Sequence, residues 1–386
     1  MISDVYFPRI NGVSTSIKTF MAELQQQGHD VTLIAPDYEQ ASSMSNVIRI
    51  PSLPVPLDPE DRMMRLSHII RLIPSLKTKN FNLIHIHTPF IAHYAGIKLS
   101  KRLHIPAVIT YHTLFEEYLY HYIPLFSKSV WRFFARRLSS YQCNQAHGVI
   151  VPSSIMIEVL KKYGVNTPIT MIPTGIDVKK FSTPRCQHFQ DKFNIPKNKK
   201  ICLTVSRLAF EKNIEFLLKV IQHVRPIKPD IHFIIAGEGP AKKHYKKLVS
   251  AMHLQDHISF VGYLDHDTDL IDCYHFSDIF IFSSKTETQG LVLLEAMACG
   301  LPIVSLAEMG TLDILNNCSS AFIPDENIEQ FSEVIINLLS DDHVVDKYAI
   351  AAKQHAYQWD TKTLTHEMKQ FYQHTIQTYH DISNSN

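Results

Sequence analysis

The chain has 386 residues, of which 45% are hydrophobic and 19% are charged. At about 150 residues per domain this length predicts two to three domains, and the apolar fraction excludes a disordered or collagen-like chain. None of the 6 cysteines belongs to a C-x-x-C pair, which argues against a disulfide scaffold or a zinc ribbon. The sequence has no run of 18 apolar residues, and its N-terminus has no basic stretch followed by an apolar one. A spanning helix and a signal peptide are therefore not expected, and a reducing cytoplasm is the predicted compartment.

The net charge of +1 hides an uneven distribution along the chain. Residues 1–176 hold 17 Lys and Arg against 11 Asp and Glu, whereas residues 177–386 hold 21 against 26. The 12 basic residues between Arg62 and Ile157 are accompanied by only two acids, Glu116 and Glu117. A local excess of this kind predicts an anionic partner, with ordinary surface variation as the alternative.

Short apolar runs alternate with amphipathic segments of helical length, such as Val13–Gln27 and Asn213–Val224. The predicted strands are Val31–Ala35, Leu83–Ile86, Ala107–Thr110, Gly148–Val151, Thr170–Ile172, Ile201–Val205, His232–Ala236, Ile258–Val261, Ile279–Phe282 and Pro302–Ser305. This alternation is typical of parallel sheets with helices on both faces, and the units are too many for one open sheet. We expect an α/β protein with two doubly wound domains, at about 1–175 and 176–358. A C-terminal helical segment, 359–386, is expected to pack back on the first domain.

The start of the chain carries the first candidate ligand loop. Only Met1–Asp4 precede "VYFPRINGV", whereas a strand normally has about five or six residues, so either the first strand is short or the true start codon lies upstream. Gly12 separates this strand from a helix expected to begin near Ser14. A glycine there lets backbone N–H groups and the helix dipole approach a phosphate, although plain turn geometry is the commoner reason for it.

In the second predicted domain, cations follow a strand directly. Arg207 and Lys212 of "VSRLAFEKN" leave the carboxyl end of the sheet, where open α/β folds bind ligands. Together they could clamp a diphosphate, and the alternative is a solvated loop. The next strand ends in "AGEGP" with Gly237 and Gly239. This segment lacks the third glycine of a dinucleotide fingerprint, which disfavours a dehydrogenase.

The most informative segment is "SSKTETQGLVLLEAMACGLPIVS" at 283–305. Glu287 and Glu295 are eight residues apart, just over two helical turns, so Glu295 is expected on the helix face that points toward the Gly290 turn. The first carboxylate can accept hydrogen bonds from sugar hydroxyls and the second can hold a ribose diol. The N–H groups of Gly290, Leu291 and Val292 lie at a predicted helix N-terminus, available to a phosphate or a sugar oxygen.

Taken together, these motifs resemble the donor domain of the retaining glycosyltransferases of family 4. The N-terminal half is similar to the same family in the order "FPRINGVSTSIKTF", "HIHTPF", "TYHTLFEEYLYHY" and "IPTGIDVKKF", so the resemblance covers essentially the whole chain. The segments "YHTLFEEYLYHY" and "SKTETQGLVLLEAMA" are most similar to the diacylglycerol glucosyltransferase-like branch. The short first strand departs from the family pattern and affects the expected geometry of the Gly12 loop.

The resemblance implies a GT-B fold, with two Rossmann-like domains facing a central cleft. Residues 1–175 would bind the acceptor and residues 176–358 the nucleotide-sugar donor. His112, at the end of the strand in "AVITYHT", matches the active-site histidine beside the reacting sugar. The resemblance assigns the remaining roles as follows: Gly12 borders the diphosphate, Arg207 and Lys212 neutralise it, Glu287 holds the donor sugar, Glu295 holds the ribose, and Gly237, Gly290, Leu291 and Val292 complete the donor site.

The mechanism implied by the resemblance is a front-face displacement, in which the leaving diphosphate accepts the proton of the acceptor. Because Glu287 and Glu295 serve donor binding, no nucleophile remains for the double displacement of glycoside hydrolases. No metal or other cofactor is expected, although Asp265 and Asp267 match a D-x-D pattern. His85 and His87 share a strand face, where we expect His87 to line a pocket and His85 to be structural. No third ligand at suitable spacing accompanies them for a metal.

Two basic amphipathic segments predict a membrane-facing surface. At 127–138, Lys128, Arg132, Arg136 and Arg137 accompany the apolar Trp131, Phe134 and Leu138. At 62–73, Arg62, Arg65, His68 and Arg71 recur every third residue opposite Met63, Leu66, Ile70 and Ile73. Basic amphipathic helices with aromatic anchors are typical of the membrane interface, and the alternative is that their apolar stripes pack on the sheet. No stacking or groove-reading motif indicates a nucleic acid partner.

The sequence thus predicts a retaining hexosyltransferase on the inner face of the cell membrane. It is expected to move glucose from UDP-glucose to a membrane lipid such as diacylglycerol. The alternatives are an enzyme of polysaccharide or lipid-linked glycan assembly, a nucleotide-sugar epimerase, and a non-catalytic nucleotide-sugar binder.

Overall fold

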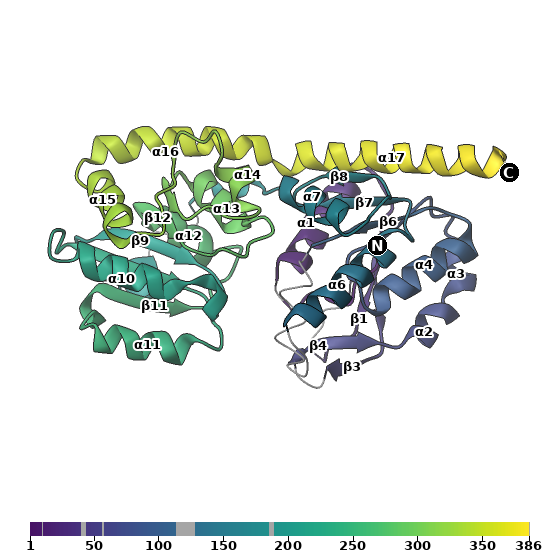
Figure 1. Ribbon diagram of the computed structural model, residues 1–386, viewed down its shortest axis with the longest axis horizontal. Helices are drawn as coiled ribbons and strands as arrows, with labels where there is room; N and C mark the ends of the chain where they lie inside the picture. The colour runs from purple at the N-terminus through teal and green to yellow at the C-terminus, as the bar shows by residue number, and fades with distance from the viewer. Residues whose placement is uncertain (10, 40–43, 56–57, 113–127, 185–188, 386) are drawn as a thin grey trace. The chain divides into compact units, whose positions relative to one another are not determined.

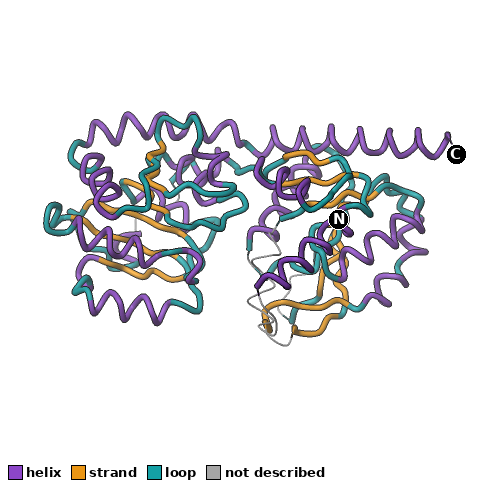
Figure 2. Tube along the Cα trace, viewed as in Figure 1, coloured by secondary structure: helices purple, strands orange, loops and turns teal. Residues whose placement is uncertain are grey.

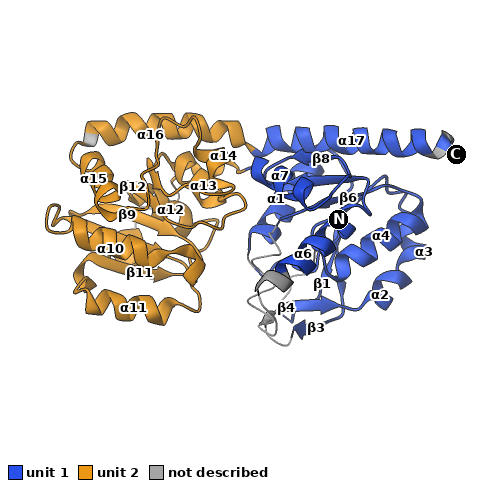
Figure 3. Ribbon diagram, viewed as in Figure 1, with its two compact units in different colours: residues 1–175, 361–386 blue, residues 176–360 orange. Residues whose placement is uncertain are grey.

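The computed structural model describes residues 1–9, 11–39, 44–55, 58–112, 128–184 and 189–385. The chain divides into two compact units, which are described separately (Figure 3). Unit 1 comprises residues 1–175 and 361–386, and unit 2 comprises residues 176–360. In both, strands alternate with helices along the chain (Figure 2). No helix in the described part of the chain has the length and apolar content needed to cross a membrane.

Unit 1 is built on parallel strands (Figure 1). Its strands are β1 (Leu33–Pro36), β2 (Val47–Ile50), β3 (Ser52–Val55), β4 (Asp58–Met64), β5 (Ile84–Ile86), β6 (Ala107–Thr110), β7 (Gly148–Val151) and β8 (Ile169–Met171). Its helices are α1 (Gly12–Gln26), α2 (Leu66–Arg71), α3 (Ile73–Lys77), α4 (Ile91–Leu103), α6 (Lys128–Cys143), α7 (Ser154–Lys162) and α17 (Thr361–Ser385). The parallel order is β5-β6-β7-β8, and β1 pairs in parallel with β2. Ile2 joins these two sets through parallel bridges to Ile34 and Ile86.

The core of unit 1 lies on both faces of this sheet. Leu33 packs with Ile17 and Leu24 of α1, whereas its neighbour Ile34 packs with Ala92 and other apolar residues of α2, α3 and α4. Consecutive strand residues point to opposite faces, so α1 covers one face and α2 to α4 cover the other. Helix α17 contacts α1 and approaches β7 closely. A Cβ atom added to Gly148 would lie 2.6 Å from a ring atom of Phe371.

The predicted amphipathic helix over 62–73 is wrong at its N-terminal end. Arg62 and Met63 belong to β4, which pairs antiparallel with β3 and places Met63 opposite Leu53. The exposed fraction is 47% for Met63 and 2% for Met64, the alternation of a strand rather than the stripe of a helix. Helical structure begins only after Arg65, in α2 and then α3. The four basic residues therefore do not share one helix face.

Unit 2 contains one six-stranded parallel sheet. Its strands are β9 (Lys200–Val205), β10 (Ile231–Ala236), β11 (Ile258–Gly262), β12 (Ile279–Phe282), β13 (Ile303–Ser305) and β14 (Ala321–Phe322). Its α-helices are α8 (Val178–Phe181), α9 (Phe189–Lys192), α10 (Ile214–Val224), α11 (Lys242–Ala251), α12 (Asp269–Phe276), α13 (Leu291–Cys299), α14 (Thr311–Leu315), α15 (Ile328–Leu338) and α16 (Asp342–Ala356). Three short 3₁₀ helices are η1 (Phe210–Lys212), η2 (Gln255–His257) and η3 (Tyr357–Trp359).

The order of these strands is β11-β10-β9-β12-β13-β14, so the first strand of the unit lies in the middle of its sheet. The chain winds outward in one direction from β9 to β11 and in the other from β12 to β14. Helices α10, α11 and α15 pack on one face through residues such as Phe233 and Ile281. On the other face, Tyr274 of α12 contacts the ring of Phe280. Open sheets of this kind bind ligands where the winding reverses, here between β9 and β12.

Candidate active site

The point of reversal in unit 2 brings together residues from two loops. Lys212 lies in η1 after β9, and Glu287 lies in the loop after β12. The Lys212 Nζ and a Glu287 carboxylate oxygen are 2.5 Å apart, and both side chains are mostly buried. Arg207, at the start of the same loop as Lys212, is exposed. The structure thus pairs the residue predicted to bind a diphosphate with the one predicted to bind the sugar.

Two glycines after β10 allow the loop that carries Arg207 and Lys212 to lie close to the edge of the sheet. Gly237 has a φ of +132°, and a Cβ there would lie 2.0 Å from the carbonyl oxygen of Ser206. A Cβ on Gly239 would lie 2.4 Å from the carbonyl oxygen of Leu208. The Leu208 N–H donates to the carbonyl oxygen of Glu238 at 2.9 Å. These glycines therefore position the segment that carries Arg207, and direct donor contact by Gly237 stays a prediction.

The N-terminus of α13 lies next to the Glu287 loop. Gly290 precedes the helix with a φ of +96°, a left-handed conformation that favours glycine. Glycine has no side chain that could cap the helix. The N–H groups of Leu291 and Val292 lie at the N-terminus of α13, where the helix dipole places a partial positive charge. The Gly310 N–H donates to the carbonyl oxygen of Glu287 at 3.0 Å and anchors the preceding loop. This arrangement suits a phosphate or a sugar oxygen.

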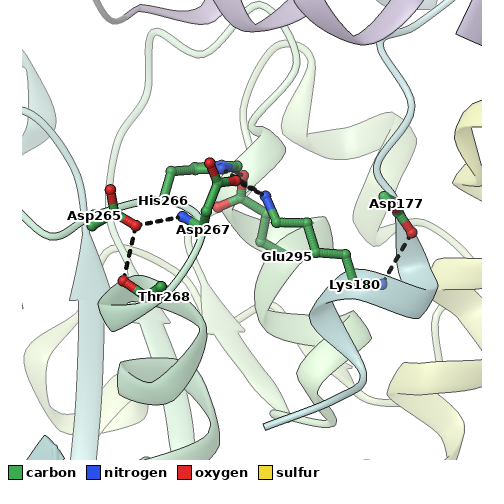
Figure 4. A network of polar contacts seen from close by, with 7 residues as sticks. All are labelled: Asp177, Lys180, Asp265, His266, Asp267, Thr268 and Glu295. Atoms are coloured by element: carbon green, nitrogen blue, oxygen red, sulfur yellow. Dashed lines mark hydrogen bonds and ion pairs between the residues drawn. The ribbon is translucent and has the colours of Figure 1, made fainter. Parts of the chain in front are cut away.

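Glu295 of α13 is held from two sides, by His266, which Figure 4 shows, and by Tyr274. Its exposed fraction is 5%. One carboxylate oxygen is 3.1 Å from His266 Nε2, and the other accepts a hydrogen bond from the Tyr274 hydroxyl at 2.9 Å. Burial alone would raise the pKa of Glu295, but the contacts with His266 and Tyr274 outweigh it and lower the pKa. A ribose bound by Glu295 would share this carboxylate with two side chains of unit 2.

The same network extends to the segment at the start of unit 2. Lys180 forms an ion pair with Asp267, and its Nζ lies 3.3 Å from His266 Nδ1. Asp265 accepts from the Asp267 N–H at 3.0 Å and from the Thr268 hydroxyl at 2.9 Å, so it shapes the turn before α12 (Figure 4). Both acids of the D-x-D pattern thus have protein partners. Across the described residues, no group of three or more His, Cys, Asp and Glu is arranged to hold a metal ion.

Sequence analysis missed three members of this network, Lys180, His266 and Tyr274. Lys180 belongs to the segment "IPTGIDVKKF", and His266 lies between the two acids of the D-x-D pattern, but no spacing links either of them to Glu295. Tyr274 is fully buried, and its position in α12 is indistinguishable from that of an ordinary core aromatic. Only the packing of α12 against α13 reveals the contact.

In unit 1, α1 begins at Gly12, two residues before the expected start. The Asn11 side chain caps the helix by accepting from the Ser14 N–H at 2.8 Å. A Cβ on Gly12 would meet nothing within 4 Å, and its φ is not in the left-handed region. The backbone conformation of this turn therefore does not require a glycine at position 12. Its predicted place beside the diphosphate stays a prediction.

His112 follows β6 and contacts a second histidine. Its Nε2 lies 3.1 Å from Nδ1 of His87, which follows β5. Burial lowers the pKa of His112 to about 4 and the pKa of His87 well below 6.5. Both imidazoles are therefore neutral at pH 7.

Helix α6 confirms that the basic segment at 127–138 is helical from Lys128 onward. Among its described side chains, the buried ones are small or polar: Ala135, Ser139, Gln142 and Cys143. Phe133 and Phe134 are 61% and 58% exposed. Leu138 is 40% exposed, so Phe133, Phe134 and Leu138 are not buried against the sheet as the alternative interpretation required.

The basic residues of α6 differ in their surroundings. Arg136 and Arg137 are exposed, and Arg132 is half-buried. The guanidinium of Arg136 lies 5.5 Å from the centre of the Tyr163 ring. The side chains of Lys128 and Trp131 lie outside the described residues, as does the segment 113–127.

Two family descriptions match the chain. "Glycosyltransferase Family 4" matches residues 10–180, and "Glycosyl transferases group 1" matches residues 187–358. The sucrose-phosphate synthase of Thermosynechococcus elongatus has a similar structure, with a TM-score of 0.76 and 20% identity, covering 98% of this chain and 99% of that one. These findings and the two α/β units define a glycosyltransferase with the GT-B fold.

Two curated relatives narrow the assignment. The alpha-monoglucosyldiacylglycerol synthase of Streptococcus pneumoniae is 32% identical over 79% of this chain and 70% of its own length. The protein of the same name from Acholeplasma laidlawii is 29% identical over 79% of both chains. The chain belongs to the family 4 glycosyltransferases and is a hexosyltransferase.

Proposed function

We propose that this enzyme transfers glucose from UDP-glucose to diacylglycerol in a membrane, with retention of the anomeric configuration. The observation that carries the proposal is the exposed aromatic and basic face of α6, in a chain similar to two monoglucosyldiacylglycerol synthases. A lipid acceptor lies in a bilayer, and the enzyme must reach it there. The choice of UDP as the nucleotide rests on the motif resemblance.

In this proposed reaction, each residue of the predicted donor site has a role. As the bond between glucose and the diphosphate breaks, negative charge grows on the leaving oxygens, and Arg207 and Lys212 stabilise it. The leaving phosphate accepts the proton of the acceptor hydroxyl while the new bond forms on the same face of the sugar. Glu287, next to Lys212, binds the sugar hydroxyls. His112 acts at the transferred sugar, and no metal ion takes part.

Attachment to the membrane would use the exposed residues of α6. Arg136 and Arg137 attract anionic headgroups, while Phe133 and Phe134 enter the interface. The enzyme would then be peripheral on the inner face of the cell membrane, where nucleotide sugars and acceptor lipid meet. Unit 2, with its net negative charge, supplies the donor site and needs no membrane contact.

The test is transfer in vitro with defined components. The purified enzyme is incubated with UDP-glucose and vesicles of phosphatidylglycerol that contain diacylglycerol, and the lipids are analysed by mass spectrometry. The expected product is monoglucosyldiacylglycerol with an α linkage by NMR. The variant His112→Asn should give little product, and a wild-type rate in it would contradict the role of His112.

Other donors and acceptors are run in parallel. Product only with a polyprenyl-phosphate sugar acceptor would replace this proposal by a role in lipid-linked glycan assembly. Conversion of UDP-glucose without any acceptor would indicate an epimerase. Binding of UDP-glucose without turnover under all conditions would indicate a nucleotide-sugar binder.

A further inference from the structure

Unit 1 contains a row of imidazoles that begins at His112 and ends at the C-terminal helix. His85 and His87 are both 2% exposed, and their rings are in contact, tilted by 33° with centroids 3.9 Å apart. His87 Nδ1 contacts His112 Nε2 at 3.1 Å. His85 Nδ1 lies 2.6 Å from the hydroxyl of Tyr372, which belongs to α17. Side chains far apart in sequence are thus connected to a predicted catalytic residue.

The ring of His85 is fixed at both nitrogens. Its Nε2 lies 2.6 Å from the hydroxyl oxygen of Thr110 in β6, and its Nδ1 meets Tyr372. A hydroxyl can donate or accept, so a neutral His85 satisfies both contacts in either tautomer. Burial lowers the pKa of His85 well below 6.5, which keeps the ring neutral. With both nitrogens occupied, His85 has no lone pair left for a metal and forms a rigid surface against His87.

His87 has one partner at Nδ1, while its buried Nε2 has no hydrogen-bond partner among the described residues. Two proton arrangements are compatible with the contact to His112. In the first, His87 Nδ1–H donates to His112 Nε2, and the unpartnered Nε2 of His87 carries only a lone pair. In the second, His112 Nε2–H donates, and the unpartnered Nε2 of His87 carries a buried N–H. The first is favoured because an unsatisfied buried N–H is rarer and costlier than an under-satisfied acceptor.

This arrangement has a chemical consequence for His112. When its Nε2 accepts from His87, the single proton of the neutral ring must lie on Nδ1. Its remaining free function is therefore an N–H donor and not a lone pair. An N–H can stabilise an oxygen of the transferred sugar but cannot remove a proton from the acceptor. That agrees with the mechanism proposed above, in which the leaving phosphate takes this proton.

We propose that His87 is a positioning residue that sets the tautomer and ring orientation of His112, and that Tyr372 of α17 supports it through His85. The inference rests on the proposed catalytic role of His112. It gives the C-terminal helix a part in building the active site, besides its packing on α1.

The first test reads the tautomer directly, without any substrate. The protein is labelled with ¹⁵N-histidine, and the His112 signals are assigned by their loss in His112→Asn. The expected spectrum shows His112 protonated at Nδ1 at pH 7. In His87→Phe, which keeps a stacked ring but lacks nitrogens, we expect a mixture of both His112 tautomers. An Nε2-protonated His112 in the wild type, or no change in His87→Phe, would overturn the inference.

The second test measures transfer of glucose to diacylglycerol. His87→Phe should lower kcat about 10- to 100-fold, as loss of a residue that orients a functional histidine does, with KM for UDP-glucose unchanged. His87→Asn places an amide near the Nδ1 position and should recover most of the activity. Equal losses in His87→Phe and His87→Asn would indicate a role in packing and contradict the positioning role.

Tyr372→Phe tests the contribution of α17 and has a matched control on the same helix. Tyr379→Phe also removes a hydroxyl from a half-buried tyrosine, whose ring packs on His147 with centroids 4.9 Å apart. Tyr372→Phe should lower kcat several-fold, and Tyr379→Phe should not. Identical rates in the two variants would remove Tyr372 from the inference. If the wild type does not transfer glucose at all, the proposed function fails, and the NMR test still decides whether His87 sets the tautomer.

Discussion

At the scale of single residues, the contact of Lys212 with Glu287 bears on the role proposed for Lys212, the stabilisation of a leaving group. A lysine side chain loses rotational freedom when it binds, which weakens its contribution. The contact with Glu287 at 2.5 Å already restricts Lys212 before a donor arrives. Arg207, by contrast, is exposed. Lys212 is thus preorganised by the residue predicted to bind the sugar.

Replacing Arg207 or Lys212 by Ala should cost about 2–4 kcal/mol of transition-state stabilisation, because each removes a charge-assisted partner of the leaving diphosphate. The measurement is kcat/KM for glucose transfer. Lys212→Ala should have the larger effect, since it also leaves the Glu287 carboxylate without its cation. The control is Lys219→Ala, which breaks an exposed ion pair with Glu215 in the same unit and should leave kcat/KM unchanged. Turnover like that of the wild type in both donor-site variants would refute the assignment.

The same two cations lead to a prediction about metal ions. If Arg207 and Lys212 supply the positive charge that other glycosyltransferases take from a divalent ion, EDTA should leave the transfer rate largely unchanged. The rate is measured after dialysis against EDTA and again after addition of magnesium or manganese. Loss of activity with EDTA and recovery with either metal would show that the leaving group needs a bound ion.

At the scale of elements, Glu295 connects three segments of unit 2. The residue lies on α13, its partner Tyr274 on α12, and its partner His266 in the turn before α12. Through His266 the network reaches Lys180 of α8. A buried carboxylate with these partners stabilises the packing of α13 against α12, whatever its predicted part in binding a ribose. Its ionisation should therefore affect the stability of the fold.

Glu295→Gln should lower the free energy of unfolding by about 1–3 kcal/mol at pH 7, the usual cost of disrupting a buried hydrogen-bonded group. The folded-state pKa of Glu295 lies below its unfolded value, so its ionisation stabilises the fold above about pH 4.3, and this stabilisation is lost as the pH falls further. The difference in the free energy of unfolding between Glu295→Gln and the wild type should therefore become smaller below that pH. Urea unfolding followed by circular dichroism between pH 7 and pH 3.5 measures it. Glu215→Gln, at an exposed pair, should change stability by less than about 0.5 kcal/mol, and a pH-independent gap for Glu295→Gln would contradict the ionic role.

The elements also show what a sequence can predict. Buried parallel strands are continuous apolar runs, and β6, β7 and β12 have the predicted bounds because little else produces that pattern. β3 and β4 were missed because this separate antiparallel pair of strands is only half apolar. The alternation in Arg62–Met64 also coincides with a helical spacing over a short window. The pairing of Lys212 with Glu287 follows from the strand order and could be expected once the loops were placed. The contacts of Glu295 with His266 and Tyr274 depend on side-chain packing, which no spacing encodes.

At the scale of the whole molecule, the charge is divided between the two units. The net charge is +6 over residues 1–176 and −5 over residues 177–386. The positive charge of unit 1 favours an anionic surface and the negative charge of unit 2 is repelled by it, so the proposed function predicts that the enzyme approaches a bilayer through unit 1. The corrected structure of 62–73 removes one predicted amphipathic helix from that surface. Helix α6 therefore carries most of the predicted membrane contact.

Removing the four charges of Lys128, Arg132, Arg136 and Arg137 should weaken binding to anionic vesicles. At roughly 1 kcal/mol per basic residue near the surface, the loss is about 4 kcal/mol, or about a thousandfold in affinity at low salt. High ionic strength should reproduce this loss in the wild type, because salt screens the same attraction. The measurement is co-sedimentation with vesicles of graded phosphatidylglycerol content. The matched control removes Lys197, Lys243, Lys246 and Lys247 of unit 2, which changes the net charge equally. It also breaks the exposed ion pair of Lys197 with Asp191 and the cation–π contact of Lys246 with Phe260.

The apolar residues of α6 are expected to make their own contribution to vesicle binding, which can be distinguished from that of the charges. Trp131→Ser, and Phe133→Ser with Phe134→Ser, should weaken vesicle binding at every salt concentration, because burial of apolar area does not depend on charge. Titration with UDP should give the same affinity in all these variants, since the residues predicted to bind the diphosphate and the ribose, Arg207, Lys212 and Glu295, lie in unit 2 and not in α6. If the fourfold charge variant sediments like the wild type while the unit 2 control does too, α6 is a solvated face. A soluble acceptor would then explain the enzyme better than diacylglycerol.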